Sequence, residues 1–600
     1  MKAEVTTIST RGMSAPRDLQ TLLSADAREA TRARANRWIK QLRLVEYDGR
    51  SMRERFQYRR DSLWWFTELY LHKMRRLETA IATILALDAA RERDGPDRIV
   101  IESGDDVVRL AARAFGAARG IAVDVEGTSS RRADRAWQGY LVGLTARLSR
   151  WRPAPPRFVP ARPTVAAFVH TAFWQAAGDG VERESYIGPV LAALQTELPP
   201  EELVCVGVGP RRNFRARRWW DPMAAPGASL PAVIPIEQLA PLRELDGSLA
   251  LWRARERLAR ELTSGDAIRD AARLDGVDLW PVLRHELEAV ALVQWPWSAR
   301  AMDEAGASLD RLSPRAVVTY AEAGGWGRAL VLEARRRGIP SVGVQHGFIY
   351  RHWLNYRHEP DEIAPAGDDR GAPIPTRTLV FDRYAAAHLE RDGGFPRDAV
   401  VTTGSARLDE LVARFAEAAE TRGELRTALG VGAGGKLLVL AAKHSEIRPY
   451  LPALADAVTA AGGIRLVVKP HPAETPDVYA DIAQHRPAVS IAPPDAALAD
   501  LLAAADGLVT MNSTVAIDGL ALGVPALVVG LPNNLSPFVE AGVMLGAPDD
   551  LPGPIRALLY DADVRRGLFE RATAFAAEFG VRSDGRAAAR AATAILALTR

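Results

Sequence analysis

Short apolar runs alternate with helical segments along most of this 600-residue chain, and this alternation limits the folds open to it. Residues 98–102 and 121–125 are apolar and β-branched, and residues 107–119 between them have helical spacing. A strand, a helix and a second strand in this order predict a βαβ unit, whose parallel strands are covered by helices. We therefore expect an α/β fold built on parallel sheets.

The alternation continues in two series, which a long loop separates. Residues 348–376 hold Tyr, His, Asn, Asp, Gly and Pro without periodicity, and long loops in compact proteins are often functional. Before this loop, expected strands lie at residues 165–170, 203–208, 316–320 and 341–345. After it, they lie at residues 378–381, 399–402, 436–441, 464–468, 489–491, 507–510 and 526–529.

The length of the chain requires several domains, because 600 residues exceed what one hydrophobic core holds. We predict a helical, basic N-terminal extension over residues 1–95. An N-terminal Rossmann-like domain over residues 96–375 and a C-terminal Rossmann-like domain over residues 376–600 are expected to face each other across a cleft. Residues 130–151 and 249–305 are expected to be mostly helical.

Composition excludes several classes of protein. A net charge of +3 is small for this length and argues against a dedicated nucleic-acid binder. The single cysteine, Cys205, excludes an internal disulfide and a cysteine-rich zinc cluster. No apolar run reaches about 18 residues, and the first residues lack the apolar core of a signal peptide. We therefore expect a cytoplasmic protein.

The first 90 residues combine basic helices with aromatic side chains. Arginine and lysine recur from residue 28 to residue 76, and Leu63-Trp64-Trp65-Phe66 lies among them. One interpretation is a helical layer with solvated arginines and an aromatic face toward the core. The alternative is an interfacial surface at the inner face of the cytoplasmic membrane, because basic helices with Trp and Phe settle on anionic membranes.

Lys469-Pro470-His471-Pro472 directly follows the expected strand at residues 464–468. Two prolines stiffen the turn and hold the side chains near them. Ligands bind at the carboxyl ends of strands in open α/β sheets, where a lysine suits a phosphate and a histidine can donate a hydrogen bond to one. The alternative is a solvated lysine and a histidine that only caps the turn.

Asn512-Ser513-Thr514 lies between the expected strand at residues 507–510 and a helix. These are N-cap residue types, and the free N–H groups and the dipole of a helix N-terminus favour an anion. The hydroxyls of Ser513 and Thr514 can add donors. Asp518, about one turn further on, can accept hydrogen bonds from ribose hydroxyls. Simple capping is the alternative interpretation.

His346 follows the expected strand at residues 341–345 and precedes Gly347, which allows a sharp turn. A histidine facing the cleft can take a proton from a hydroxyl group or bind a diphosphate. Glu322, at the end of the preceding strand, is a competing base. The alternative for His346 is a buried histidine with all its hydrogen bonds satisfied.

Two further cationic residues follow strands of the second series. Arg407 can point to the cleft or form a structural pair with an aspartate, and Lys443 can line the ligand pocket. No histidines and carboxylates have the spacing of a metal site, so we expect no metal. Three side chains of the long loop can recognise a second substrate: His352, Tyr356 and His358.

Several of these motifs together resemble GT-B glycosyltransferases of bacterial surface polysaccharides. They are Gln345-His346-Gly347, residues 404–409, Lys469-Pro470-His471-Pro472, and Asn512-Ser513-Thr514 with Asp518. The set is similar to capsule enzymes, including Kdo and polysialic acid transferases, and to CDP-glycerol glycerophosphotransferases. The resemblance covers roughly residues 315–545. It departs at Ser405-Ala406-Arg407, where some relatives have a proline before the arginine, and this leaves the role of Arg407 open.

The resemblance implies a glycosyltransferase with a nucleotide-sugar donor on the C-terminal domain, a glycan or lipid-linked glycan acceptor on the N-terminal domain, and no metal or other cofactor. The donor's phosphates would be held by Lys469, His471, Ser513 and Thr514, with Asn512, Lys443 and Arg407 beside them. The donor's ribose would be bound by Asp518. The base would be His346 or Glu322. Three alternatives stay open: a glycerophosphotransferase acting on CDP-glycerol, a non-hydrolysing UDP-sugar 2-epimerase, and a non-catalytic nucleotide- or glycan-binding protein.

Overall fold

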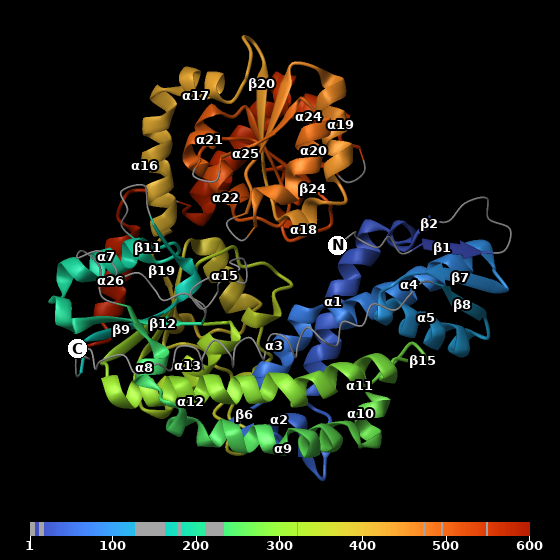
Figure 1. The fold of residues 1–600 in the computed structure, drawn as a ribbon, viewed down its shortest axis with the longest axis vertical. Coiled ribbons are helices and arrows are strands. Elements are labelled where there is room, and N and C mark those ends of the chain that lie inside the picture. The colour runs from blue at the N-terminus through green and yellow to red at the C-terminus, as the bar shows by residue number, and fades with distance from the viewer. Residues whose placement is uncertain are drawn as a thin grey trace.

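The computed structural model describes most of the chain (Figure 1). The helix predicted over residues 130–151 and the motif residue Pro472 lie outside the described residues. The described residues are 7–10, 17–126, 162–176, 182–209, 233–320, 322–471, 474–493, 496–547, 550–581 and 583–600.

The first lobe, as we call it, contains a seven-stranded sheet in the order β13-β12-β9-β16-β17-β18-β19. Every neighbouring pair in it is parallel. Buried apolar side chains pack on both faces, as expected for a sheet covered by helices. The strands are β9 (Val165–His170), β12 (Leu203–Val208), β13 (Val233–Pro235), β16 (Ala316–Thr319), β17 (Ser341–Val344), β18 (Arg377–Val380) and β19 (Val400–Thr402).

The second lobe contains a six-stranded parallel sheet in the order β22-β21-β20-β23-β24-β25. Apolar clusters again lie on both of its faces. Two parallel sheets covered by helices confirm the predicted α/β class with two Rossmann-like lobes. The strands are β20 (Lys436–Ala441), β21 (Ile464–Val468), β22 (Val489–Ile491), β23 (Gly507–Thr510), β24 (Ala526–Val529) and β25 (Leu545–Ala547).

Helices connect the strands of the two lobes. The helices that follow β18 in the chain are α15 (Arg383–Arg391), α16 (Ala406–Glu420), α17 (Arg422–Ala428), α18 (His444–Ile447), α19 (Leu451–Ala461), α20 (Ala480–His485), α21 (Leu498–Ala504), α22 (Val515–Ala521), α23 (Ser536–Glu540), α24 (Pro552–Tyr560), α25 (Ala562–Phe579) and α26 (Ala587–Leu596). The prediction of helix over residues 249–305 is confirmed by α9 (Asp246–Thr263), α10 (Asp266–Asp270), α11 (Trp280–Ala289) and α12 (Trp295–Leu312).

Two strands belong to a different sheet from the one expected. The second strand series was expected to include β18 and β19, but β18 pairs directly with β17 in the first lobe, and β19 pairs with β18. The C-terminal helix α26 also returns to the first lobe, where its apolar face packs with α7 (Gly188–Glu197). A long loop between strands does not break a sheet, because pairing depends on the strands themselves. The limits of the domains stay predictions.

A small separate sheet lies in the N-terminal part of the chain, in the order β2-β1-β7-β8. The expected strands near residues 98–102 and 121–125 are present as β7 and β8. They pair with each other, and β7 also pairs with β1, instead of extending the first-lobe sheet. The elements here are β1 (Thr7–Thr10), β2 (Arg17–Asp18), β7 (Arg98–Glu102), β8 (Ala122–Glu126), α1 (Ala25–Leu42), α2 (Met52–Arg55), α3 (Trp64–Met74), α4 (Arg76–Asp94) and α5 (Asp106–Arg119).

The N-terminal helices pack into the first lobe through aromatic side chains and ion pairs. Trp64, Trp65 and Phe66 are fully buried, which confirms the aromatic core face. Lys40 on α1 contacts both Glu68 and Glu362 at 2.6 Å. The solvated arginines expected here are in large part paired, and the aromatic side chains are unavailable to a membrane surface. Among the described residues, no helix is long and apolar enough to cross a membrane.

Candidate functional site

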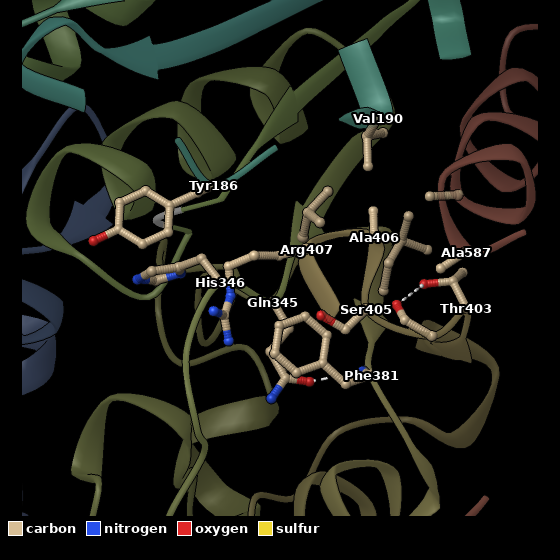
Figure 2. A pocket seen from close by; sticks show the side chains of 14 residues that line it. Tyr186, Val190, Gln345, His346, Phe381, Thr403, Ser405, Ala406, Arg407 and Ala587 are labelled. Carbon is tan, nitrogen blue, oxygen red and sulfur yellow. Dashed lines mark hydrogen bonds between the residues drawn. The ribbon is translucent and has the colours of Figure 1, made fainter. Parts of the chain in front are cut away.

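A pocket lies at the carboxyl edge of the first-lobe sheet, where the strands of a parallel sheet place the residues that follow them. Figure 2 shows Tyr186, His346 and Arg407 on one side of this pocket and Thr403 and Ser405 on the other. Helix α26 closes it through two alanines, Ala587 and Ala591. Its free space is about 10 Å³, roughly the room of one water molecule.

His346 borders this pocket from the turn after β17. The rings of Tyr186 and Tyr320 meet its ring edge-on, with centroids at 5.3 and 5.4 Å. Burial lowers the pKa of His346 to about 4, although a hydrogen bond with the backbone of Tyr320 acts in the opposite direction. Within the described part of the chain, its Nδ1 is buried without a hydrogen-bond partner. The imidazole is therefore neutral at pH 7 and has a free nitrogen.

Glu322, the competing base, is buried behind the same edge of the sheet. Its side chain packs on Gly343, where a Cβ would lie 2.6 Å from Cδ of the glutamate. Tyr356 donates a hydrogen bond to its Oε1 at 2.8 Å, and Oε2 has no hydrogen-bond partner among the residues that the structure describes. Burial raises the pKa of Glu322 to about 8. The carboxyl group is therefore mostly protonated at pH 7, and it is not among the residues that line the pocket.

Arg407 and Asp518 form an ion pair between the two lobes. Nη2 of Arg407 donates to both carboxylate oxygens of Asp518, at 2.6 and 2.8 Å. The sequence left open whether Arg407 points to the cleft or forms a structural pair with an aspartate. In the structure it pairs with an aspartate, and it also lines the pocket. Asp518 was expected to accept from ribose hydroxyls, but in this conformation Arg407 occupies both of its oxygens.

The second lobe presents two lysines and an asparagine at the carboxyl ends of three adjacent strands. Lys469 follows β21, Lys443 follows the central strand β20, and Asn512 follows β23. Nζ of Lys469 donates to the backbone oxygen of Ala496 at 2.6 Å. Lys443 is exposed, and His471 is half-buried in the turn after Lys469.

Asn512 is held by two neighbouring segments and has a φ of +57°. Its side-chain amide donates to Glu446 at 3.1 Å, and its Oδ1 accepts from the backbone N–H of Asn534 at 2.9 Å. Both ends of the side chain are thus engaged in shaping this edge. Ser513 accepts from the backbone N–H of Val515 at 3.3 Å, at the start of the seven-residue helix α22.

The two carboxyl edges meet directly. The hydroxyl of Thr514, in the second lobe, accepts a hydrogen bond from the backbone N–H of Phe348 at 3.2 Å. Phe348 lies two residues after His346, so this bond and the Arg407–Asp518 pair connect the pocket to the start of α22. The sequence-predicted residues His346, Arg407, Thr514 and Asp518 are therefore brought together, whereas Glu322 lies behind them.

Sequence reasoning missed Tyr186 and Gln345. Tyr186 precedes α7 and contacts His346 from a part of the chain with no strand-end motif, so only tertiary structure reveals it. Gln345 is adjacent to His346, and its amide links the backbones of Phe381 and Gly347 at 2.8 and 2.9 Å. The position of Gln345 beside His346 could have predicted this role. A glutamine at the end of a buried strand needs hydrogen-bond partners, and the neighbouring backbone supplies them.

Two loop histidines considered for substrate contact lie elsewhere. His352 pairs with Glu29 on α1 at 2.5 Å, and His358 is buried, which holds its pKa well below the usual range. Within the described ranges, no three His, Cys, Asp or Glu side chains gather in a way that could hold a metal ion.

No protein-family model and no curated protein sequence matches the chain. Among solved structures, UDP-GlcNAc 2-epimerase from Neisseria meningitidis bound to UDP-GlcNAc is 12% identical, with a TM-score of 0.39 over 69% of this chain and 98% of that chain. The UDP-N-acetylglucosamine 2-epimerase from Rickettsia bellii is 12% identical, with a TM-score of 0.41 over 73% and 96%. The wall teichoic acid polymerase TagF is 12% identical, with a TM-score of 0.39 over 78% and 98%. At these values the likeness assigns no activity and no residue role to this chain.

Proposed function

We propose that the protein is a GT-B glycosyltransferase that moves a sugar from a nucleotide-sugar donor to a surface polysaccharide or glycolipid acceptor. The proposal rests on the contact between the carboxyl edges of the two sheets, made by the Phe348–Thr514 hydrogen bond and the Arg407–Asp518 pair. One edge bears a neutral histidine with a free nitrogen, and the other bears lysines and hydroxyl side chains. A proton acceptor near groups that can hold a phosphate suits glycosyl transfer from a nucleotide.

In the proposed reaction, the acceptor hydroxyl attacks the anomeric carbon of the donor sugar. The bond between that carbon and the nucleotide phosphate breaks, and the phosphate leaves with the electron pair. His346 accepts the proton of the hydroxyl through its unpartnered Nδ1. Lys469, His471, Lys443 and the hydroxyls of Ser513 and Thr514 stabilise the negative charge on the leaving phosphate.

His346 is proposed as the base in preference to Glu322. A base must be unprotonated and must reach the substrate. His346 is unprotonated at pH 7 and lines the pocket, which supports this choice, whereas Glu322 has a pKa of about 8 and is not among the lining residues. Glu322 instead supports this edge of the sheet through its hydrogen bond with Tyr356.

The pocket has room for about one water molecule in this conformation, so we propose that the lobes separate to admit the substrates and then close again. Opening would break the Arg407–Asp518 pair and the Phe348–Thr514 hydrogen bond. It would also free Asp518 for ribose hydroxyls and Arg407 for a donor phosphate. Closing over bound substrates would then exclude water, which limits hydrolysis of the donor.

The experiment that tests this function is a donor screen with a nucleotide-release readout. UDP-, GDP-, CMP- and CDP-linked compounds are incubated with the protein, with and without glycan acceptors. Release of nucleotide that depends on a sugar donor and an acceptor is the expected result. Release from CDP-glycerol alone among the donors would indicate a glycerophosphotransferase. Epimerisation without an acceptor would indicate a 2-epimerase, and binding without turnover a non-catalytic protein.

A further inference from the structure

Four arginines gather in the first lobe beside the segment that follows His346. Arg28 and Arg32 lie one turn apart on α1, and Arg75 lies at the junction of α3 and α4. Arg351 lies in the loop five residues after His346. We call these four residues the arginine cluster.

The arginine cluster has more positive charge than its neighbours neutralise. Glu78 is shared, at 2.9 Å from Arg75 and 3.6 Å from Arg32. Glu29 is shared between Arg351, at 2.6 Å, and His352. Arg28 forms no ion pair among the described residues. Arg351 also pairs with Glu540 of the second lobe, at 3.5 Å. Four guanidinium groups therefore share three carboxylates.

Two guanidinium nitrogens of the cluster are buried without a hydrogen-bond partner in the described part of the chain. They are Nε of Arg28 and Nη1 of Arg32. Buried donors are nearly always hydrogen-bonded in native proteins, and an unpaired buried charge is costly. Burial is the main cause that lowers the pKa of Arg32, and the charge of Arg75 adds to it while Glu78 opposes it. These groups are therefore poised for an anionic partner.

The cluster lies where the N-terminal helices approach the second lobe. In Figure 1, the N-terminal end of α1 lies below α18 of the second lobe. The charge of Glu446, on α18, also reaches Arg75 and Tyr350. Tyr350 stacks on Trp353 with ring centroids 5.2 Å apart, which gives the cluster a rigid aromatic edge.

We propose that the arginine cluster binds an oxyanion group, a carboxylate or a phosphate, of the acceptor glycan. Guanidinium groups offer forked N–H donors that match the oxygens of both anions. The inference deepens the proposed function, on which it rests, by assigning a negatively charged acceptor. It also gives the N-terminal extension a part in substrate recognition.

The test is calorimetric titration of the full chain with saccharides of different charge. The anionic probes are a hyaluronan tetrasaccharide and mannose 6-phosphate, and the neutral probe is maltotetraose. Wild-type protein is expected to bind at least one anionic probe more tightly than maltotetraose, with an affinity that falls as salt is added. Arg28→Gln and Arg75→Gln are each expected to weaken that binding about tenfold.

Arg93→Gln is the matched control, because Arg93 is an exposed arginine on α4 whose one ion pair among the described residues is with its neighbour Asp94. Arg28→Gln is expected to leave the melting temperature unchanged or higher, since no carboxylate of the described residues loses an ion pair with it. Equal binding by wild type and both cluster variants, or no anionic probe bound at all, would overturn the inference. Vesicles of acidic lipid are titrated as a further probe. If the cluster variants lose affinity for these vesicles but not for the anionic saccharides, the inference would also be overturned, because the cluster would then bind a lipid headgroup.

Nucleotide affinity, measured in the same proteins, separates this inference from the proposed function. The cluster variants are expected to bind nucleotide like the wild type. If the wild type binds an anionic saccharide through the cluster but no nucleotide, the proposed function fails and the anion site remains. If it binds nucleotide but no anionic saccharide, the anion site fails alone.

Discussion

At the scale of single residues, the protonation state of His346 governs the proposed chemistry. Replacing a general base typically costs about 100-fold to 10,000-fold in rate. We therefore expect His346→Gln to lower kcat by at least about 100-fold, with KM changed far less. Steady-state kinetics measure this. His485→Gln is the matched control, because His485 is an exposed histidine on α20. A variant at His346 with wild-type kcat would refute the assignment of the base.

The pH profile checks the same residue independently. The pKa of His346 is lowered to about 4, so the imidazole stays unprotonated at mildly acidic pH. The rate constant kcat/KM is therefore expected to stay level on the acid side through pH 6.5 and to fall only as the pH approaches 4. A loss of activity with a midpoint near 6.5 would show an ordinary histidine and contradict the structure.

Glu322 is expected to affect stability rather than catalysis. Its pKa of about 8 in the folded protein lies above the usual 4.5, so the folded state keeps a proton that the unfolded chain releases between these values. The contribution of Glu322 to stability is therefore largest at low pH and is lost as the pH rises from about 4.5 to about 8. Glu322→Gln should flatten this part of the pH profile of the melting temperature and keep most of the activity. An unaltered profile together with lost activity would instead favour Glu322 as the base.

At the scale of secondary-structure elements, helix α1 is fixed to the first lobe by a buried charge. Lys40 is 4% exposed and contacts Glu68 and Glu362. Removing one partner of a buried ion pair leaves an uncompensated charge and costs about 3 to 5 kcal/mol. Lys40→Met should lower the free energy of unfolding by about that amount, measured by urea denaturation with tryptophan fluorescence. Trp64, which donates to Glu362 at 2.8 Å, is a suitable reporter.

Lys73→Met is the matched control for Lys40, because Lys73 is exposed at the end of α3 and forms no ion pair among the described residues. It is expected to change stability little, since exposed lysines contribute little. Equal effects of the two substitutions would mean that the buried charge does not fix α1 to the lobe.

The sequence located most strands but could not assign all of them to a sheet. Apolar runs such as residues 464–468 predict a buried strand on local grounds, and the structure shows β21 there. The partners of β18 and of β7 depend on contacts between distant segments, which a local pattern does not contain. The loop at residues 348–376 suggested a boundary, yet buried ion pairs such as Arg53 with Asp369 tie it to the N-terminal helices.

At the scale of the whole molecule, strand-end reasoning placed many candidate residues at two sheet edges. Parallel strands make this predictable, because their carboxyl ends share one edge. The contacts between the edges were not predictable, since the Arg407–Asp518 pair and the Thr514 hydrogen bond depend on how the two lobes dock. The roles of these residues stay predictions.

The central claim is that the carboxyl edge of the second lobe binds the phosphates of a nucleotide-linked donor. The most direct measurement is the affinity of wild type, Lys469→Ala and His471→Ala for the nucleotides UDP, GDP, CMP and CDP. Lys436→Ala is the matched control, because Lys436 begins β20 at the opposite edge of the same sheet. We expect one of these nucleotides to bind the wild type and Lys436→Ala with the same affinity. We expect its affinity for Lys469→Ala and for His471→Ala to be at least about tenfold lower. Equal affinities in all four proteins, or no nucleotide bound by any, would contradict it.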